Sequence, residues 1–164
     1  MKNLIIIIFL CTSTAVWSQF YTREFGVRGG YTSAFVFRVN IHDALSYEAQ
    51  VAYRDGGSIA GLVRQVHREI GMDQNGNWIF THGFGAHLGF YLTNSYRFFF
   101  REIYYGRRLF TPVVGLDGYM AIEYQMVDVP VSFGVNFQPY MEISLKKLFG
   151  INLWDFGVSV KYRF

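Results

Sequence analysis

The last eleven residues of the chain, 154–164, alternate strictly between apolar side chains and polar or small ones. Trp154, Val158 and Phe164 belong to the apolar set, and Lys161 and Arg163 belong to the polar set. Successive side chains of a β-strand point to opposite sides of the sheet. The period of two therefore predicts a strand with one apolar face and one polar face.

The same alternation recurs along most of the chain. It is found in the segments 24–31, 35–42, 45–54, 78–90, 114–126 and 129–138. The segment 58–68 also has strand character, but apolar and polar side chains mix on both of its faces, so its orientation stays open. With the last strand this makes eight, the smallest number common among membrane β-barrels. We therefore expect an all-β fold, an eight-stranded antiparallel up-and-down transmembrane β-barrel.

The lengths of the expected connections agree with such a barrel. Links 43–44 and 127–128 are very short, whereas 93–111 and 142–153 are long and fall on the opposite end. Short turns on one side and long loops on the other are typical of outer-membrane barrels. The segment 69–77 departs from this rule, because it predicts a long turn on the short-turn side.

The N-terminal segment has the three parts of a secretory signal peptide. Lys2 gives the positive start, residues 4–10 are apolar, and Val16-Trp17-Ser18 precedes the expected cleavage site. We expect residues 1–18 to be removed after Ser18 and residues 19–164 to form the barrel domain. An uncleaved anchor is disfavoured because the apolar run is too short to span a bilayer. The single cysteine, Cys11, would leave with the signal peptide, which excludes disulfides and thiol chemistry in the mature chain.

Composition helps to decide which face of the barrel points outward. Half of the chain is hydrophobic (51%) and a fifth is aromatic (20%), but only 16% is charged, against about 25% in a typical soluble domain. A soluble barrel would turn its apolar face inward and a charged face outward. The polar faces here carry Gly, Ser, Asn and Gln with few charges, which favours an apolar face toward lipid. The net charge of +3 argues against a nucleic-acid partner.

At this point the sequence resembles a known family. Residues 156–164, with Tyr162 and the terminal Phe164, look like the assembly signal that ends outer-membrane barrels. The chain is similar to the small barrels of the OmpA transmembrane-domain and OmpX type. Gly115-Leu116-Asp117-Gly118, Glu123-Tyr124, Pro130 and Gln138-Pro139 look like the layout of an uncharacterised subgroup of them. The resemblance implies the outer membrane of a Gram-negative cell envelope, with the barrel assembly machinery as a partner during biogenesis.

The polar faces collect charges of both signs, which would lie in the barrel interior. An eight-stranded barrel is just wide enough for side chains to fill it, and buried charges must be paired. We expect an ion-pair plug; a narrow conduction path or a proton relay is the alternative. The expected network consists of Glu24, Arg28, Arg38, Glu48, Arg54, Asp117, Glu123, Lys161 and Arg163, with His87 on the same face.

The expected outer segment 96–110 combines aromatic residues with four arginines, Arg97, Arg101, Arg107 and Arg108. Arginine binds phosphate through two parallel hydrogen bonds. The hypothesis is a contact with outer-membrane lipid, such as the phosphates of lipopolysaccharide, or with a partner protein. The alternative is that the segment extends its two strands and places its aromatics at the membrane surface.

The sequence shows no catalytic or metal-binding pattern. The four histidines, His42, His67, His82 and His87, lack the spacing of a metal site and show no serine and carboxylate partners. We therefore expect no catalytic residue, metal or cofactor, and a structural or surface-interaction role. The alternative functions are a lipid A modifying enzyme and a barrel component of an export assembly.

Overall fold

The computed structural model describes residues 22–98, 101–144 and 150–164. These residues form ten strand segments and no helix, so none of them belongs to a helix that could cross a membrane. The strands are β1 (Arg23–Gly30), β2 (Ser33–His42), β3 (Leu45–Arg54), β4 (Gly57–Met72), β5 (Gly76–Phe98), β6 (Arg101–Met126), β7 (Val131–Phe137), β8 (Tyr140–Ser144), β9 (Gly150–Asn152) and β10 (Phe156–Arg163).

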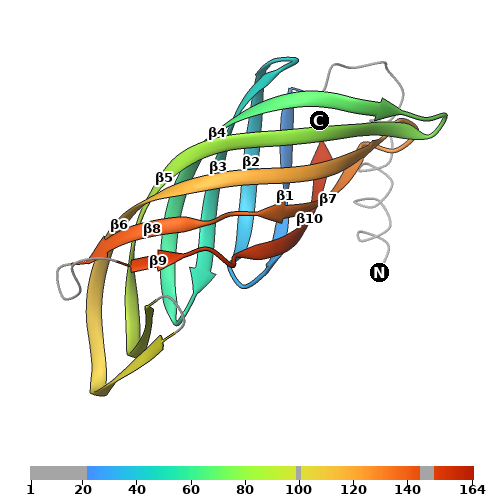
Figure 1. Cartoon of the computed structure of the whole chain (residues 1–164). Coiled ribbons are helices and arrows are strands. Elements are labelled where there is room, and N and C mark those ends of the chain that lie inside the picture. The colour runs from blue at the N-terminus through green and yellow to red at the C-terminus, as the bar shows by residue number, and fades with distance from the viewer. Residues whose placement is uncertain (1–21, 99–100, 145–149) are drawn as a thin grey trace, which may run out of the picture.

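The ten segments form one closed, antiparallel, eight-stranded barrel with up-and-down topology (Figure 1). β7 and β8 both pair with β6 and make one interrupted strand, and β9 and β10 make another. Going around the barrel, β1 to β6 follow in sequence order, then β7 with β8, then β10 with β9. β10 pairs with β1 and completes the ring. The expected fold class is thereby confirmed as a closed eight-stranded barrel.

The interruption between β7 and β8 lies at Gln138-Pro139. Proline has no N–H to give to the ladder. The Pro139 carbonyl instead accepts a hydrogen bond from the Gly118 amide at 2.8 Å, and the Gln138 amide donates to the Asp155 carbonyl at 2.8 Å. The break therefore costs few backbone hydrogen bonds and keeps the strand in the barrel wall.

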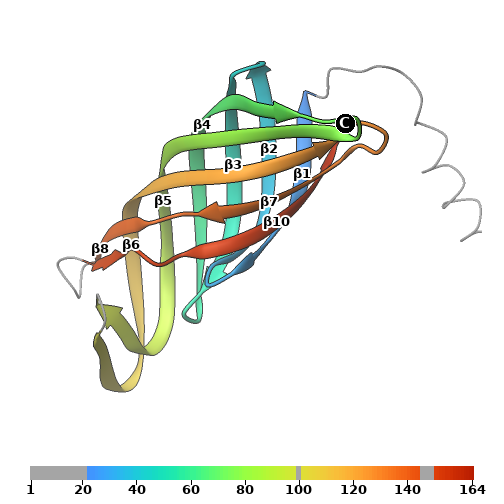
Figure 2. The ribbon, with the colours of Figure 1, turned by 45° about the vertical axis from the view of Figure 1, so that its right-hand side comes forward.

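Both ends of the described chain and the turns after β2, β4 and β6 lie at one end of the barrel, which we call the termini end (Figures 1 and 2). The turns after β1 and β3 and the β5–β6 hairpin lie at the opposite end, the far end. The turn after β3 is the two-residue pair Asp55-Gly56, with φ angles of 47° and 73°. Positive φ at both positions is the type I′ hairpin turn, for which Asp-Gly is a favoured pair.

Parts of both expected outer loops are strand, so the loop lengths predicted for 93–111 and 142–153 were wrong. The alternative for 96–110, that the segment extends its two strands, is confirmed. β5 continues to Phe98 and β6 begins at Arg101, so most of 93–111 is a paired hairpin with a register shift between Thr93 and Ser95. β8 and β9 occupy parts of 142–153. In the sequence, aromatic residues stand at both odd and even positions of 96–110, which hides the period of two, but backbone pairing does not require alternation.

The prediction of a long turn at 69–77 was also wrong. β4 reaches Met72 and β5 begins at Gly76, which leaves a turn of three residues, 73–75. The Asp73 carboxylate accepts the amide hydrogens of Asn75 and Gly76, both at 2.8 Å, and the Tyr124 hydroxyl at 3.0 Å. These hydrogen bonds, first of all that from Asn75, hold the pKa of Asp73 below its usual range. Polar turn residues thus close a tight hairpin.

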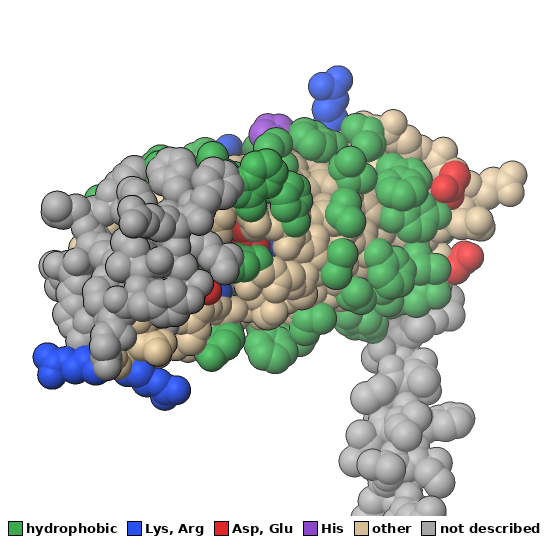
Figure 3. Space-filling view, turned by 60° about the horizontal axis from the view of Figure 1, so that its bottom comes forward, with side chains coloured by type: hydrophobic (Ala, Val, Ile, Leu, Met, Phe, Trp, Pro, Cys, Tyr) green, Lys and Arg blue, Asp and Glu red, His purple; other side chains and the backbone are tan. Residues whose placement is uncertain are grey.

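The barrel is apolar outside and polar inside. Among the described residues, 34 large hydrophobic side chains are exposed, including Phe35 at 61% and Val158 at 60%. Figure 3 shows apolar side chains covering the barrel wall. The segment 58–68, left open by the sequence, turns Leu62 and Arg64 outward and buries Val63 and Gln65. This distribution is the reverse of that in a soluble barrel.

Candidate functional site in the barrel interior

Arg38 on β2 lies at the centre of the interior. Its guanidinium forms two hydrogen bonds of 2.7 Å with the Glu123 carboxylate on β6, and it also contacts Glu24 at 3.2 Å and Glu48 at 3.0 Å. Arg38 is 0% exposed, and the three acids are 1% exposed. β2 and β6 stand four strands apart in a ring of eight, so they face each other across the barrel. The Arg38–Glu123 pair therefore closes the interior at this level.

Lys161 on β10 joins the same cluster. Its ammonium lies 2.7 Å from Glu123 and 3.2 Å from Glu48. Two cations thus face three carboxylates, and Gln50 donates a further hydrogen bond to Glu48 at 2.9 Å. Buried charges need such partners to offset their lost hydration. The cluster links five strands of the barrel, β1, β2, β3, β6 and β10.

A second cluster lies nearer the far end and is organised by Arg54 on β3. Its guanidinium contacts the Glu142 carboxylate at 2.8 Å and the Tyr91 hydroxyl at 2.7 Å, and it lies 3.4 Å from the centre of the Tyr140 ring. His87 lies beside it, with Nδ1 2.8 Å from Asp117. β3 and β8 also face each other across the ring. Arg54–Glu142 is therefore a second bridge across the interior.

A third crossing lies between these two levels. The side-chain amide of Gln138 donates a hydrogen bond to the side-chain oxygen of Gln50 at 3.0 Å. Gln50 is on β3, and Gln138 is the first residue of the interruption between β7 and β8. Hydrogen-bonded side chains therefore span the barrel at three successive levels. Within the described residues, all three crossings are made by side chains of the barrel wall itself.

The remaining predicted cations have different partners. Arg28 pairs with Asp155 at 2.8 Å and donates to Asn136 at 2.5 Å, close to the wall between β1 and β10. Arg163, 9% exposed at the termini end, donates to the Gln125 side chain at 3.0 Å and to the Met126 carbonyl. All nine residues expected in the interior network are buried in the structure.

Sequence reasoning missed two acids of the interior, Glu142 and Asp155. Glu142 was assigned to an outer loop, although Met141 and Ile143 on either side of it continue the apolar alternation. Asp155 belongs to the period-two run of the last strand, but it was not counted among the network. Both are buried, at 3% and 1% exposed. Extending each alternating run until it fails would have found them.

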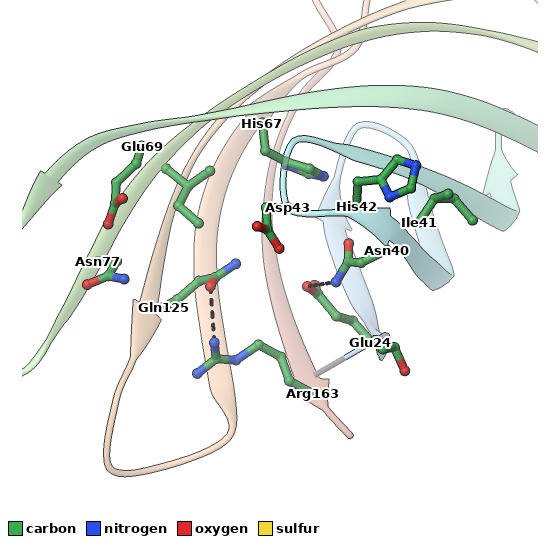
Figure 4. A pocket seen from close by; sticks show the side chains of 12 residues that line it. Glu24, Asn40, Ile41, His42, Asp43, His67, Glu69, Asn77, Gln125 and Arg163 are labelled. Carbon is green, nitrogen blue, oxygen red and sulfur yellow. Dashed lines mark hydrogen bonds between the residues drawn. The ribbon is translucent and has the colours of Figure 1, made fainter. Parts of the chain in front are cut away.

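A cavity of about 570 Å³ opens at the termini end, below the Arg38 cluster (Figure 4). It is lined by polar side chains of mixed charge, among them Glu24, His67, Glu69 and Arg163. Figure 4 shows Arg163 reaching Gln125 and Asn40 reaching Glu24 across its floor. The cavity is a vestibule to the plug and ends at the buried acids.

His67, at the edge of this vestibule, makes the contact closest to catalytic geometry. Its Nε2 lies 2.7 Å from the Ser46 hydroxyl and its Nδ1 lies 2.9 Å from the Thr81 hydroxyl. A serine nucleophile needs access to substrate and a histidine oriented by a partner, commonly a carboxylate. Ser46 is 0% exposed and the orienting group is a hydroxyl. The contact therefore satisfies buried polar groups. The described residues contain no group of His, Cys, Asp and Glu side chains that could hold a metal ion.

The residues expected at the surface lie as follows. Arg107 and Arg108 are exposed on the β5–β6 hairpin at the far end. The backbones of Arg97 and Arg101 belong to the same hairpin, and their side chains lie outside the described part of the structure. The predicted signal peptide, residues 1–18, also lies outside the described residues.

The expected assembly signal forms the closing strand of the barrel. Tyr162 and Phe164 are exposed on its outer face, and their rings stack with centroids 6.3 Å apart. The Phe164 amide donates to the Arg23 carbonyl at 2.9 Å, and the Arg23 amide donates back to the Phe164 carbonyl at 3.1 Å. The last residue of the chain therefore takes part in closing the ring.

Comparison of the chain with protein-family models, curated proteins and solved structures gives no significant match. The functional argument therefore rests on the geometry of this molecule alone.

Proposed function

We propose that this protein is a small outer-membrane β-barrel of the OmpX-like kind, with a structural or surface-interaction role and an interior closed by charged side chains. The observation that carries the proposal is the inverted barrel. Contiguous exposed apolar surface of this extent is not stable in water, whereas a lipid bilayer requires it. The aromatic pairs Trp78–Tyr124 and Tyr162–Phe164 near the termini end suit the interfacial girdle of such a barrel.

Detergent dependence tests the proposed class. We expect the mature chain, residues 19–164, to fold only with detergent or lipid and to migrate differently on a gel before and after heating. The reason is that no other environment solvates the outward face. Unheated and boiled samples in detergent are the measurement, with a detergent-free sample as the control. A protein that folds as a soluble monomer without detergent would overturn the proposal.

The bridged interior argues for a plug rather than a pore. We expect planar bilayers that contain the purified barrel to show no stable conductance steps, because Arg38–Glu123 and Arg54–Glu142 connect opposite walls. The same conductance measurement is made on the double variant Arg38→Ser/Glu123→Ser, in which both partners of one bridge are shorter. Reproducible steps with the unmodified protein would contradict the plug.

The surface-interaction role is assigned to the far-end hairpin. Arg97, Arg101, Arg107 and Arg108 belong to it, and at least Arg107 and Arg108 are exposed. With all four changed to Ala, we expect several-fold less lipopolysaccharide to remain bound to the purified barrel, because the phosphates lose their guanidinium partners. Arg23→Ala, an exposed arginine at the opposite end, is the control. Equal retention by both variants would remove lipopolysaccharide as the ligand.

A further inference from the structure

Three basic side chains interrupt the apolar outer wall on two neighbouring strands. Arg64 and Arg68 on β4 share the outward face with Leu62, and His82 on β5 is exposed beside them. In the β4–β5 register, Arg68 lies opposite Phe80 and Arg64 lies opposite Phe84, with His82 between these two rows. We call Arg64, Arg68 and His82 the basic patch. Figure 3 shows basic side chains and a histidine rising from an otherwise apolar wall.

The basic patch has no negative partner in the described part of the protein. The buried acids of the strands point into the interior, and Glu69 lines the vestibule. None of the three bases forms a hydrogen bond or ion pair there. Their contacts are with rings: Arg64 lies 6.0 Å from the centre of Phe84, and His82 stacks on Phe80 at 5.8 Å. An unpaired cation on a lipid-facing wall is unfavourable, so these positions imply a partner from outside the chain.

A hollow of about 410 Å³ in the outer wall adjoins the basic patch. Arg64 and His82 line it together with Phe84, Met120 and Pro139, and Gly118 forms its floor. Gly118 lies on the outward face of β6 between Leu116 and Met120, opposite Phe84. The Pro139 ring packs against Gly118, 3.2 Å from where a Cβ would stand, so the open part of the hollow lies beside this contact, next to Phe84 and Met120. The hollow is thus apolar with a cationic rim.

The bases and the hollow are arranged in order along the barrel axis. The row of Arg68 is closest to the termini end, the row of His82 follows, and the row that holds Arg64 and Gly118 is the deepest. His82 is four residues from Trp78, or about 13 Å along the strand and about 9 Å along the axis at a tilt of about 45°. Long basic side chains can extend toward the membrane surface from such a depth. Arg68 and His82 therefore lie nearer the headgroups than Gly118 does, and Arg64, at the depth of Gly118, reaches them by extending its side chain along the wall.

We propose that the basic patch binds a glycerophospholipid in the leaflet at the termini end, with its phosphate held by Arg64, Arg68 and His82. One acyl chain lies in the hollow, against Phe84, Met120 and Pro139. Guanidinium groups bind phosphate with charge-assisted, bidentate hydrogen bonds, and the hollow accepts the apolar part of the same molecule. This inference rests on the proposed membrane insertion. A second copy of the barrel is a poorer occupant, because the described outward strand positions offer no carboxylate to the patch.

The test is retention of a defined lipid by the purified barrel in nonionic detergent, measured by native mass spectrometry. Phosphatidylglycerol is the probe, and diacylglycerol with the same acyl chains is its phosphate-free counterpart. We expect the unmodified barrel to retain phosphatidylglycerol selectively. Arg64→Gln, Arg68→Gln and His82→Gln, made separately, should each weaken retention, with Arg64→Gln weakening it about tenfold. Arg23→Gln, which removes an outward arginine from β1, should retain as much lipid as the unmodified barrel.

Equal retention by Arg64→Gln and Arg23→Gln would overturn the inference, as would equal retention of the two probes. The inference would also be overturned if the unmodified barrel forms a dimer, the Arg64→Gln variant does not, and neither retains a lipid selectively. The partner of the basic patch would then be a second copy of the barrel. Heat-modifiable migration on a gel shows whether each variant is folded. Because the three substitutions are made separately, the test still stands if one variant does not fold. A barrel that needs detergent but binds no lipid selectively refutes only the patch, whereas a barrel folded without detergent refutes the proposed function as well.

Discussion

Replacing Arg38 with methionine is expected to destabilise the folded barrel by about 3–5 kcal/mol, the usual cost of removing one partner from a buried ionic cluster. The variant leaves Glu24, Glu48 and Glu123 together in the interior, with Lys161 as the one cation in contact with two of them. Methionine keeps an unbranched side chain that reaches about as far as Nε, so the charge, the hydrogen bonds and the volume of the outer guanidinium atoms are lost together. The measurement is reversible denaturant unfolding of the barrel in detergent or lipid.

The matched control for this variant is Arg23→Met. Arg23 lies on β1, next to β2, but it is exposed and forms no ion pair within the described residues. Its removal should change the free energy of unfolding by no more than about 0.5 kcal/mol. Adding Glu24→Gln to Arg38→Met should cost less than the sum of the two single changes, because one surplus negative charge disappears. If Arg38→Met behaves like Arg23→Met, the cluster does not hold the barrel together.

An arginine placed at the middle of the outer wall should reveal the bilayer directly. Val158 on β10 is 60% exposed, and both of its neighbours across the ladder, Gly29 and Val135, lie in the wall. In lipid vesicles, Val158→Arg is expected to reduce the free energy of unfolding by about 2–4 kcal/mol, because the guanidinium enters hydrocarbon. In a soluble barrel, the same exposed position would tolerate arginine with a change of about 0.5 kcal/mol or less.

Ile41→Arg is the control for depth. Ile41 is 50% exposed and lies next to the turn after β2, at the termini end. Near the membrane surface an arginine should cost only about 0–1 kcal/mol. Depth dependence, rather than the size of either change alone, is the decisive readout. Equal effects at Val158 and Ile41 would contradict a membrane-embedded wall.

The number of strands and the sorting of residues between the two faces could be predicted from the sequence, because alternation is a local property. Residues 154–164 alternate without exception, and the polar face of this strand places Lys161 and Arg163 in the interior. Alternation alone does not say which face is inside. The low content of charged residues is what indicates that the apolar face points outward.

Partners and strand ends could not be predicted in the same way. The Arg38–Glu123 bridge depends on strand register and on which strands stand opposite, and neither is a local property. β5 and β6 extend beyond the alternating part of the sequence, because aromatic residues stand at both odd and even positions of 96–110 and conceal the period of two. The tight turn at Asp55-Gly56 carries a recognised hairpin pair, and reading it would have fixed the start of β4. Contacts between β4 and β5, such as His67 with Thr81, likewise required the register.

The pairing of β1 with β10 has a consequence for how the protein reaches its native state. Glu24 lies opposite Arg163, so the hydrogen bonds that complete the ring join residues almost a full chain length apart. Loop closure of that length is slow and must follow the formation of the local hairpins. Until the final strand arrives, every intermediate has two open sheet edges, which invite pairing with other chains. Closure of the ring is therefore the late step of folding, and we expect a chain shortened by several C-terminal residues to keep two open sheet edges and to aggregate.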